Sequence, residues 1–271
     1  MPSPGREPPQ ATRPVMAASA RIASMTSSDA RRARVFGSVA DAYDRWRPGY
    51  PQRAIDWLVP PGAARVADVG AGTGKLTGSL LGRGLDVVAV EPDPDMLAVL
   101  RARYPAAEAT LAGAENLPLS DASVDAVLVG QAWHWFDQEK ALAQARRVTR
   151  PGGWLGLIGN VPFPRTPWQL ELAQLDPDPA HRTFVDPTED WAHAGLAGLA
   201  VETLRVPWRE EISAAGLRAR MATYSVYAVM PDDERTQSLD DAAAVLAREA
   251  DRLGASVVPF DHITFCTRVR L

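Results

Sequence analysis

The sequence predicts an α/β protein built on a doubly wound, mostly parallel sheet of seven strands with helical insertions. Between residues 64 and 160, short apolar segments alternate with helix-like segments, which is typical of a parallel sheet covered on both faces. Two more strand-like segments follow at 199–212 and 261–271. Because a lone pair of strands is marginally stable, we expect these two to complete the same sheet.

A helix is expected over 35–46 because Phe36, Val39, Ala40 and Tyr43 recur at helical spacing. The stretch "RPGYP" ends it. A short helix over 52–59 follows, and apolar runs then predict strands over 64–69, 86–91, 108–111, 124–130 and 154–160.

Helices are expected between these strands over 75–84, 91–104 and 137–153. Asp93 suits an N-cap with Pro94 at the first helical position. Asp137 caps the next helix, which Pro151 and Gly152 stop.

The second half of the chain has a weaker pattern. Several prolines and poor periodicity predict an irregular region over 161–200, and helices are expected over 214–230 and 239–253. The last strand alternates apolar residues on one face. We expect the intervening helices to lie over the top of the sheet as a lid.

Composition narrows the class of protein. The chain has 271 residues, 46% of them hydrophobic, and a net charge of -4, so neither nucleic acid nor an anionic membrane is an expected partner. The single Cys266 excludes an internal disulfide framework and a cysteine-based metal site. His181, His193 and His262 lack metal-ligand spacing, so no metal is expected. No apolar stretch approaches membrane-spanning length, and we expect a cytoplasmic protein.

Residues 1–34 are rich in Pro, Ser, Ala and Arg and carry few aliphatic side chains. Such a segment buries too little apolar surface to offset the entropy of ordering. We expect a disordered tail over 1–34 and one domain over 35–271.

The stretch "RVADVGAGTGKLT" places three alternate glycines, Gly70, Gly72 and Gly74, where a strand should turn into a helix. In a doubly wound sheet, this first turn is where ligands bind. A phosphate-binding P-loop ending in Gly74-Lys75 would need a glycine where Val69 stands. A dinucleotide fingerprint also fails, because its third glycine would fall on Lys75 or Thr77.

What remains is Asp68 followed by G-x-G-x-G, which resembles the class I S-adenosylmethionine-dependent methyltransferases. The resemblance implies a Rossmann-like methyltransferase fold, with a cofactor-binding core over 35–160 and lid segments plus the last two strands over 161–271. It implies that the loop wraps the methionine part of S-adenosylmethionine. An acid suits the cationic amino and sulfonium groups of that cofactor. Glu91, at the end of the next strand, can accept hydrogen bonds from both ribose hydroxyls.

A third resemblance lies in residues 112–137, "AGAENLPLSDASVDAVLVGQAWHWFD". In the family, the position of Gly113 is often an acid bonded to adenine, and this sequence departs there. Adenine contacts are then expected from Ala114 and Glu115. The cofactor-binding residues that the resemblance implies are Asp68, Gly70, Ala71, Gly72, Gly74, Glu91, Pro92, Ala114, Glu115 and Gln131.

The acceptor side is expected near "QAWHWF" (131–136), which follows the fourth predicted strand. His134 is the candidate catalytic base, because imidazole titrates near neutrality; the alternative is a residue that only shapes the pocket. Trp133 and Trp135 are candidate substrate-binding residues, and core packing is the alternative for both. The resemblance also places Tyr43, Arg47 and Tyr50 in a segment that closes over the cofactor. Arg47 suits a carboxylate, and a plain surface arginine is its alternative.

The function expected from these features is in-line transfer of a methyl group from S-adenosylmethionine to a small-molecule acceptor. The alternatives are a catalytically silent module that binds the same cofactor and a nicotinamide-dependent dehydrogenase, which the failed fingerprint disfavours. The sequence points to no particular acceptor and no oligomeric state.

Overall fold

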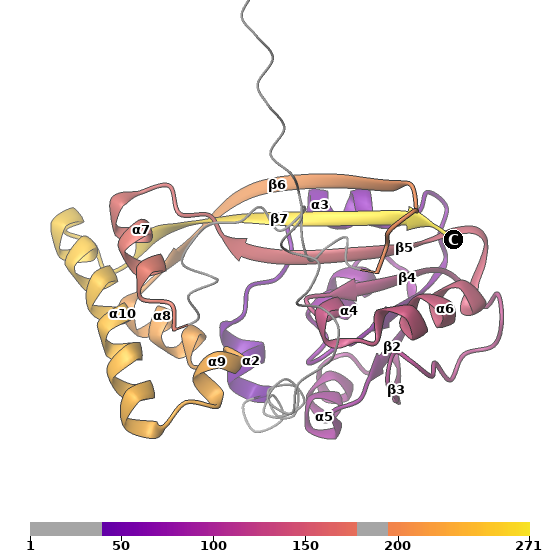
Figure 1. Cartoon of the computed structure of the whole chain (residues 1–271), viewed down its shortest axis with the longest axis horizontal. Coiled ribbons are helices and arrows are strands. Elements are labelled where there is room, and N and C mark those ends of the chain that lie inside the picture. The colour runs from indigo at the N-terminus through magenta and orange to yellow at the C-terminus, as the bar shows by residue number, and fades with distance from the viewer. Residues whose placement is uncertain (1–39, 178–194) are drawn as a thin grey trace, which may run out of the picture.

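The computed structural model describes residues 40–177 and 195–271 (Figure 1). Its centre is a seven-stranded sheet in the order β3-β2-β1-β4-β5-β7-β6. The strands are β1 (Arg65–Val69), β2 (Asp86–Glu91), β3 (Glu108–Leu111), β4 (Val124–Gly130), β5 (Thr149–Pro162), β6 (Val201–Ile212) and β7 (Val258–Arg270). The pairs from β3 to β5 are parallel, and β7 is antiparallel to both β5 and β6. The predicted doubly wound sheet, completed by the last two strands, is confirmed.

Alternation along each strand supplies two apolar faces. Val66 of β1 packs with α3 (Gln52–Leu58) and α4 (Lys75–Leu81), while Ala67 and Val69 face α6 (Gln138–Val148). Both faces are buried, as a parallel sheet requires. A further helix, α5 (Pro94–Arg103), contacts β2 and β3.

A separate apolar cluster lies beyond the end of β5 (Figure 1). β6 and β7 pair along their whole length, but β5 pairs with β7 only from His262 onward. The last residues of β6 and the first residues of β7 therefore extend past the end of β5 as a two-stranded ribbon. Three helices pack on it: α7 (Pro167–Gln174), α8 (Ala214–Met221) and α10 (Asp232–Leu253). The short α9 (Ser225–Ala228) follows α8, and α2 (Ala40–Trp46) lies between α8 and α5 and contacts both (Figure 1). The lid role of the cluster remains a prediction.

Several predicted boundaries are wrong. α7 lies within the region expected to be irregular. The single helix expected over 214–230 is divided, because Thr223 turns its hydroxyl onto the carbonyl of Arg220 at 2.6 Å and so competes with the helical ladder. α10 begins at Asp232, not at 239, because its exposed first turns have acidic residues that favour a helix N-terminus but no apolar periodicity.

The last strands also differ from the prediction. β7 begins at Val258, three residues before the expected start. β5 begins at Thr149, which pairs with Val124 before a register shift. Gly153 makes this shift possible, because a Cβ there would lie 2.3 Å from the carbonyl oxygen of Asp125. The predicted tail over 1–34, and His181 and His193, lie outside the described residues.

In the part of the chain that the structure describes, no helix combines the length and the apolar character that crossing a membrane requires.

Candidate active site

The loop between β1 and α4 lies where the strand order reverses, with β2 on one side of β1 and β4 on the other. All three of its glycines have positive φ: +69° at Gly70, +56° at Gly72 and +91° at Gly74. The amides of Gly70 and Ala71 both donate to the carbonyl of Val90, at 2.8 and 3.1 Å. The loop is therefore held against the end of β2 in a conformation that favours glycine.

The three glycines differ in what surrounds them. A Cβ at Gly70 would lie 2.6 Å from the Cβ of Ala132, and one at Gly74 would lie 2.7 Å from the Tyr104 ring. At Gly72 the nearest atom would be the Met96 sulfur, at 3.7 Å. Gly70 and Gly74 thus pack against protein, whereas Gly72 leaves its backbone open to a ligand.

Asp68 lies at the end of β1 and is completely buried. Its Oδ2 accepts a hydrogen bond from the Thr77 hydroxyl at 2.6 Å. Its Oδ1 has no hydrogen-bond partner among the described residues. Burial raises the pKa of Asp68 to about 7. A buried acceptor without a partner is costly, so this carboxylate suits a cationic or hydrogen-bond-donating ligand.

Glu91 lies at the end of β2 and is 5% exposed. Its two oxygens accept hydrogen bonds from the amides of Gly72 and Asp93, at 2.8 and 2.9 Å. Burial raises the pKa of Glu91, and the two amides oppose that shift. Each carboxylate oxygen keeps a further lone pair, so Glu91 retains the capacity to accept two hydroxyl donors. Pro92, the next residue, is exposed.

Glu115 lies close to Gly113, the position at which related sequences often have an acidic residue. Its Oε1 accepts from the amide of Asp137 at 2.9 Å, and a Cβ on Gly113 would lie 3.0 Å from its Oε2. The Glu115 carboxylate thus occupies space next to Gly113 that an acidic side chain there would otherwise approach. Ala114 is buried.

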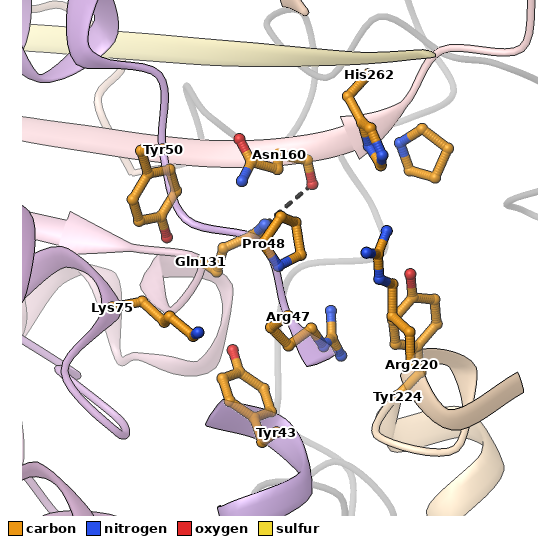
Figure 2. A pocket seen from close by; sticks show the side chains of 11 residues that line it. Tyr43, Arg47, Pro48, Tyr50, Lys75, Gln131, Asn160, Arg220, Tyr224 and His262 are labelled. Atoms are coloured by element: carbon orange, nitrogen blue, oxygen red, sulfur yellow. Dashed lines mark hydrogen bonds between the residues drawn. The ribbon is translucent and has the colours of Figure 1, made fainter. Parts of the chain in front are cut away.

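A cavity opens beside this loop (Figure 2). It is enclosed by α2 and the loop after it, the start of α4, the ends of β4 and β5, the α8–α9 region and β7. The residues that line it are Tyr43, Arg47, Pro48, Tyr50, Lys75, Gln131, Asn160, Pro162, Arg220, Tyr224 and His262.

Four of the predicted site residues meet in this cavity: Tyr43, Arg47, Tyr50 and Gln131. Gln131 has a φ of +60°, and its side chain donates to the carbonyl of Asn160 at 3.0 Å (Figure 2). A non-glycine residue in this conformation is uncommon, and such strain is concentrated at functional sites. Burial raises the pKa of Tyr50 well above its usual value.

The residues predicted on the acceptor side after β4 do not line the cavity: Trp133, His134 and Trp135 form a short 3-10 helix there. Trp133 is 2% exposed and belongs to the core, with its ring edge-on to Phe136. His134 is exposed, and its ring lies 4.7 Å from that of Trp135. The catalytic and substrate-binding roles of these residues remain predictions.

The sequence reasoning missed Lys75, Asn160, Arg220, Tyr224 and His262. Lys75 had a usable signal, because it directly follows the glycine turn. The last three reach the cavity only because the β6–β7 ribbon brings distant segments back to the sheet.

The Glu210 carboxylate joins two of the missed residues. It accepts from both Nη atoms of Arg220, at 2.5 and 2.8 Å, and lies 2.6 Å from Nε2 of His262. These two partners hold the pKa of Glu210 at about 2, although its burial opposes them. Arg220 also donates to the carbonyl of Trp46 at 2.9 Å, so α8, β6 and β7 are tied to the end of α2.

Among the residues described, no three His, Cys, Asp or Glu side chains come together in a way that would hold a metal ion.

Comparison with known proteins agrees with this geometry. Residues 67–157 match a family described as a methyltransferase domain. The chain is 42% identical to an uncharacterised methyltransferase of Mycobacterium bovis, over 91% of this chain and 100% of that protein. It is 32% identical to a malonyl-[acyl-carrier protein] O-methyltransferase of Enterobacter lignolyticus, over 65% of this chain and 76% of that protein.

Solved structures share the fold. A protein of Anaeromyxobacter dehalogenans, provisionally described as a type II methyltransferase, superposes with a TM-score of 0.59 at 24% identity, over 83% of this chain and 96% of that one. A phosphoethanolamine N-methyltransferase of Haemonchus contortus, solved with S-adenosylhomocysteine, gives 0.50 at 15% identity, over 90% of this chain and 60% of that one. The glycine turn, the order of the sheet and the extent of the match to full-length relatives lead to one conclusion: the chain belongs to the class I S-adenosylmethionine-dependent methyltransferases.

Proposed function

We propose that this protein transfers the methyl group of S-adenosylmethionine to a small-molecule acceptor bound in the cavity of Figure 2. One observation carries the proposal most directly. The open glycine backbone at Gly72, the Glu91 carboxylate and the Asp68 oxygen that has no partner in the described part of the chain lie together at the switch point of the sheet.

The residues of this chain fit the chemistry of the cofactor. The Asp68 carboxylate offers a buried negative charge to the cationic methionine end. Glu91 offers its remaining acceptor sites to the ribose hydroxyls, and Glu115 and Ala114 border the adenine. The Haemonchus contortus enzyme, which has the same fold, was solved with S-adenosylhomocysteine, and this supports the choice of cofactor.

When bound, S-adenosylmethionine supplies an electrophilic methyl group, which the acceptor attacks in line while the sulfur keeps the bonding electron pair. The protein's contribution is to position the acceptor, which accounts for much of the acceleration in such displacements. Residues of α2 and the α8–α9 region line the cavity, and limiting the access of water there would favour a transition state in which charge is neutralised.

The test begins with calorimetric titration of S-adenosylhomocysteine into wild-type protein and into Gly72→Val. We expect the substitution to weaken the affinity for S-adenosylhomocysteine at least tenfold, because a branched side chain fills the space that the open backbone leaves for the ligand. Gly62→Val is the matched control: Gly62 also has a positive φ, of +76°, and an open environment, but it precedes β1, whereas the loop follows that strand. Both variants carry a similar backbone penalty of about 1–2 kcal/mol, so only a ligand effect separates them.

Unchanged affinity in Gly72→Val would overturn the assignment of the loop. A second measurement, transfer of labelled methyl groups to a small-molecule extract, separates an enzyme from a silent binding module. Binding of S-adenosylhomocysteine without any labelled product would favour the silent module.

A further inference from the structure

The charged side chains that line the cavity are cationic. Three permanently or normally cationic side chains line it, Arg47, Lys75 and Arg220, together with His262. Among the described residues, no aspartate or glutamate lines it. Such a cavity attracts an anion, unless carboxylates behind its walls already neutralise each cation.

Two of these three cationic side chains have a carboxylate partner. Arg220 forms a two-pronged ion pair with Glu210, which also lies against His262. Lys75 lies 3.6 Å from Asp44, and it is the first residue of α4, directly after the glycine turn. Its place beside that turn suits the carboxylate at the methionine end of the cofactor.

Arg47 differs from both. Its Nε and Nη2 donate to the hydroxyl and the carbonyl of Thr223, at 2.9 and 3.2 Å. No carboxylate of the described residues lies within ion-pair distance of it. A guanidinium has five N–H donors, so the donors on Nη1 remain for a ligand.

The position of Arg47 is well defined. Its guanidinium lies over the rings of Tyr43 and Tyr224, 5.0 and 4.0 Å from their centroids. Thr223 holds it from a third side. Figure 2 shows the guanidinium directed toward the Arg220 and Tyr224 side of the cavity and away from Lys75. A rigidly held, planar group with no carboxylate partner among the described residues is suited to a planar anion.

We propose that Arg47 binds a carboxylate of the methyl acceptor, so that the substrates of this enzyme are carboxylic acids. The inference rests on the proposed function and names its substrate class. The Arg47 guanidinium, which has no ion-pair partner among the described residues, balances one carboxylate charge. A phosphate monoester carries about -1.5 to -2 at neutral pH and would leave negative charge unbalanced in the cavity.

The first experiment fractionates acceptors. Labelled methyl transfer is measured to a bacterial small-molecule extract, to the same extract amidated with carbodiimide and methylamine, and to the extract treated with phosphatase. We expect amidation to abolish transfer and phosphatase to leave it unchanged. Transfer that survives amidation, or that phosphatase removes, would overturn the inference while leaving the methyltransferase activity established. No transfer from any sample would instead count against the proposed function itself and against the inference that rests on it.

The second experiment tests the residue with the fraction that amidation inactivates. Arg47→Gln should raise the KM for the acceptor about ten- to hundredfold, the range expected when a charged hydrogen bond is lost. Its affinity for S-adenosylhomocysteine should stay within twofold of wild type. Arg45→Gln is the matched control, because Arg45 is exposed in the last turn of α2, two residues before Arg47, and does not line the cavity.

Arg47→Lys keeps the charge but loses the planar guanidinium that can donate two parallel hydrogen bonds. Its KM should therefore fall between those of wild type and Arg47→Gln. This variant also covers the case in which Arg47→Gln fails to fold, which thermal melting of each protein reveals. A wild-type KM in whichever variant folds would overturn the role of Arg47.

Discussion

At the scale of single residues, Asp68 carries the most information about the site. It has no exposed surface, one oxygen is bonded to Thr77, and the other has no partner among the described residues. Glu91 and Tyr50 are the titratable groups coupled to it. A carboxylate in this setting is stabilised in its neutral form until a ligand supplies a donor or a positive charge.

This environment predicts a pH effect on the ligand-free protein. Burial raises the pKa of Asp68 from 3.8 to about 7, so its contribution to stability is full below pH 4 and is lost as the pH rises through 7. Between pH 5 and 8, the free energy of unfolding of wild type should therefore fall by about 3 kcal/mol relative to Asp68→Asn. Urea unfolding at both pH values measures the difference. Parallel pH profiles for the two proteins would contradict the buried titration.

His134 gives a second prediction at this scale. The side chain is exposed and does not line the cavity, so we expect His134→Gln to keep most of the turnover and an unshifted pH–rate profile. A general base contributes typically about 10²-fold or more. A loss of that size, together with the disappearance of a limb near neutrality, would show that His134 is the base after all.

At the scale of elements, β6 shows how alternation along a strand assigns roles. Glu210 faces Arg220 and His262, whereas the next residue, Glu211, points to the opposite face and is exposed. Through Glu210, the strand positions α8, and α8 in turn holds the end of α2 through the bond from Arg220 to Trp46. The cavity wall therefore depends on a buried ion pair.

Removing that carboxylate should destabilise the protein in a pH-dependent way. The pKa of Glu210 is lowered from 4.5 to about 2, so its contribution to stability is present above pH 4.5 and is lost as the pH falls through 2. Glu210→Gln should lower the free energy of unfolding by about 3 kcal/mol at pH 7, with a smaller difference at pH 3. Glu211→Gln serves as the control and should change stability by less than about 0.5 kcal/mol. An equal decrease in the free energy of unfolding of the two variants would contradict this role of the ion pair.

At the scale of the whole molecule, the last two strands and the cofactor-side half of the sheet depend on each other. β7 pairs with β5 from residue 154 to 162 and covers part of α3, with the Arg268 side chain bonded to the Trp57 carbonyl at 2.7 Å. Cys266 and Val206 belong to the same apolar cluster as Ile55 and Leu58. Four of the first five strands, β1, β2, β4 and β5, thus share this cluster with the last two.

We therefore expect a chain that ends at residue 200 not to fold on its own. It would leave β5 as a long unpaired edge and uncover apolar side chains of α3, which favours aggregation. Thermal unfolding of the fragment, followed by circular dichroism, should not be cooperative. Size-exclusion chromatography should show aggregates in place of a species of monomer size. A fragment that unfolds cooperatively and binds S-adenosylhomocysteine as tightly as the full chain would instead show that the cofactor-binding core is autonomous.

The amino-acid sequence by itself determined the features that depend on local physics. Strand–helix alternation follows from periodicity, so the sheet and most of its strands were predictable. The turn at Gly70, Gly72 and Gly74 follows from backbone conformation, since all three residues have positive φ. The resemblance carried by Asp68 and these glycines then pointed to the family.

The tertiary structure alone decided the features that join residues distant in sequence. Trp133 and Gln131 are close neighbours in the chain, yet one is in the core and the other is in the cavity, because the direction of each side chain depends on how the loop after β4 packs. Arg220 and His262 reach Arg47 only through the ribbon that extends past β5. Periodicity reports which face of an element is apolar, but not which other element covers it, and the acceptor cavity is formed by such pairings.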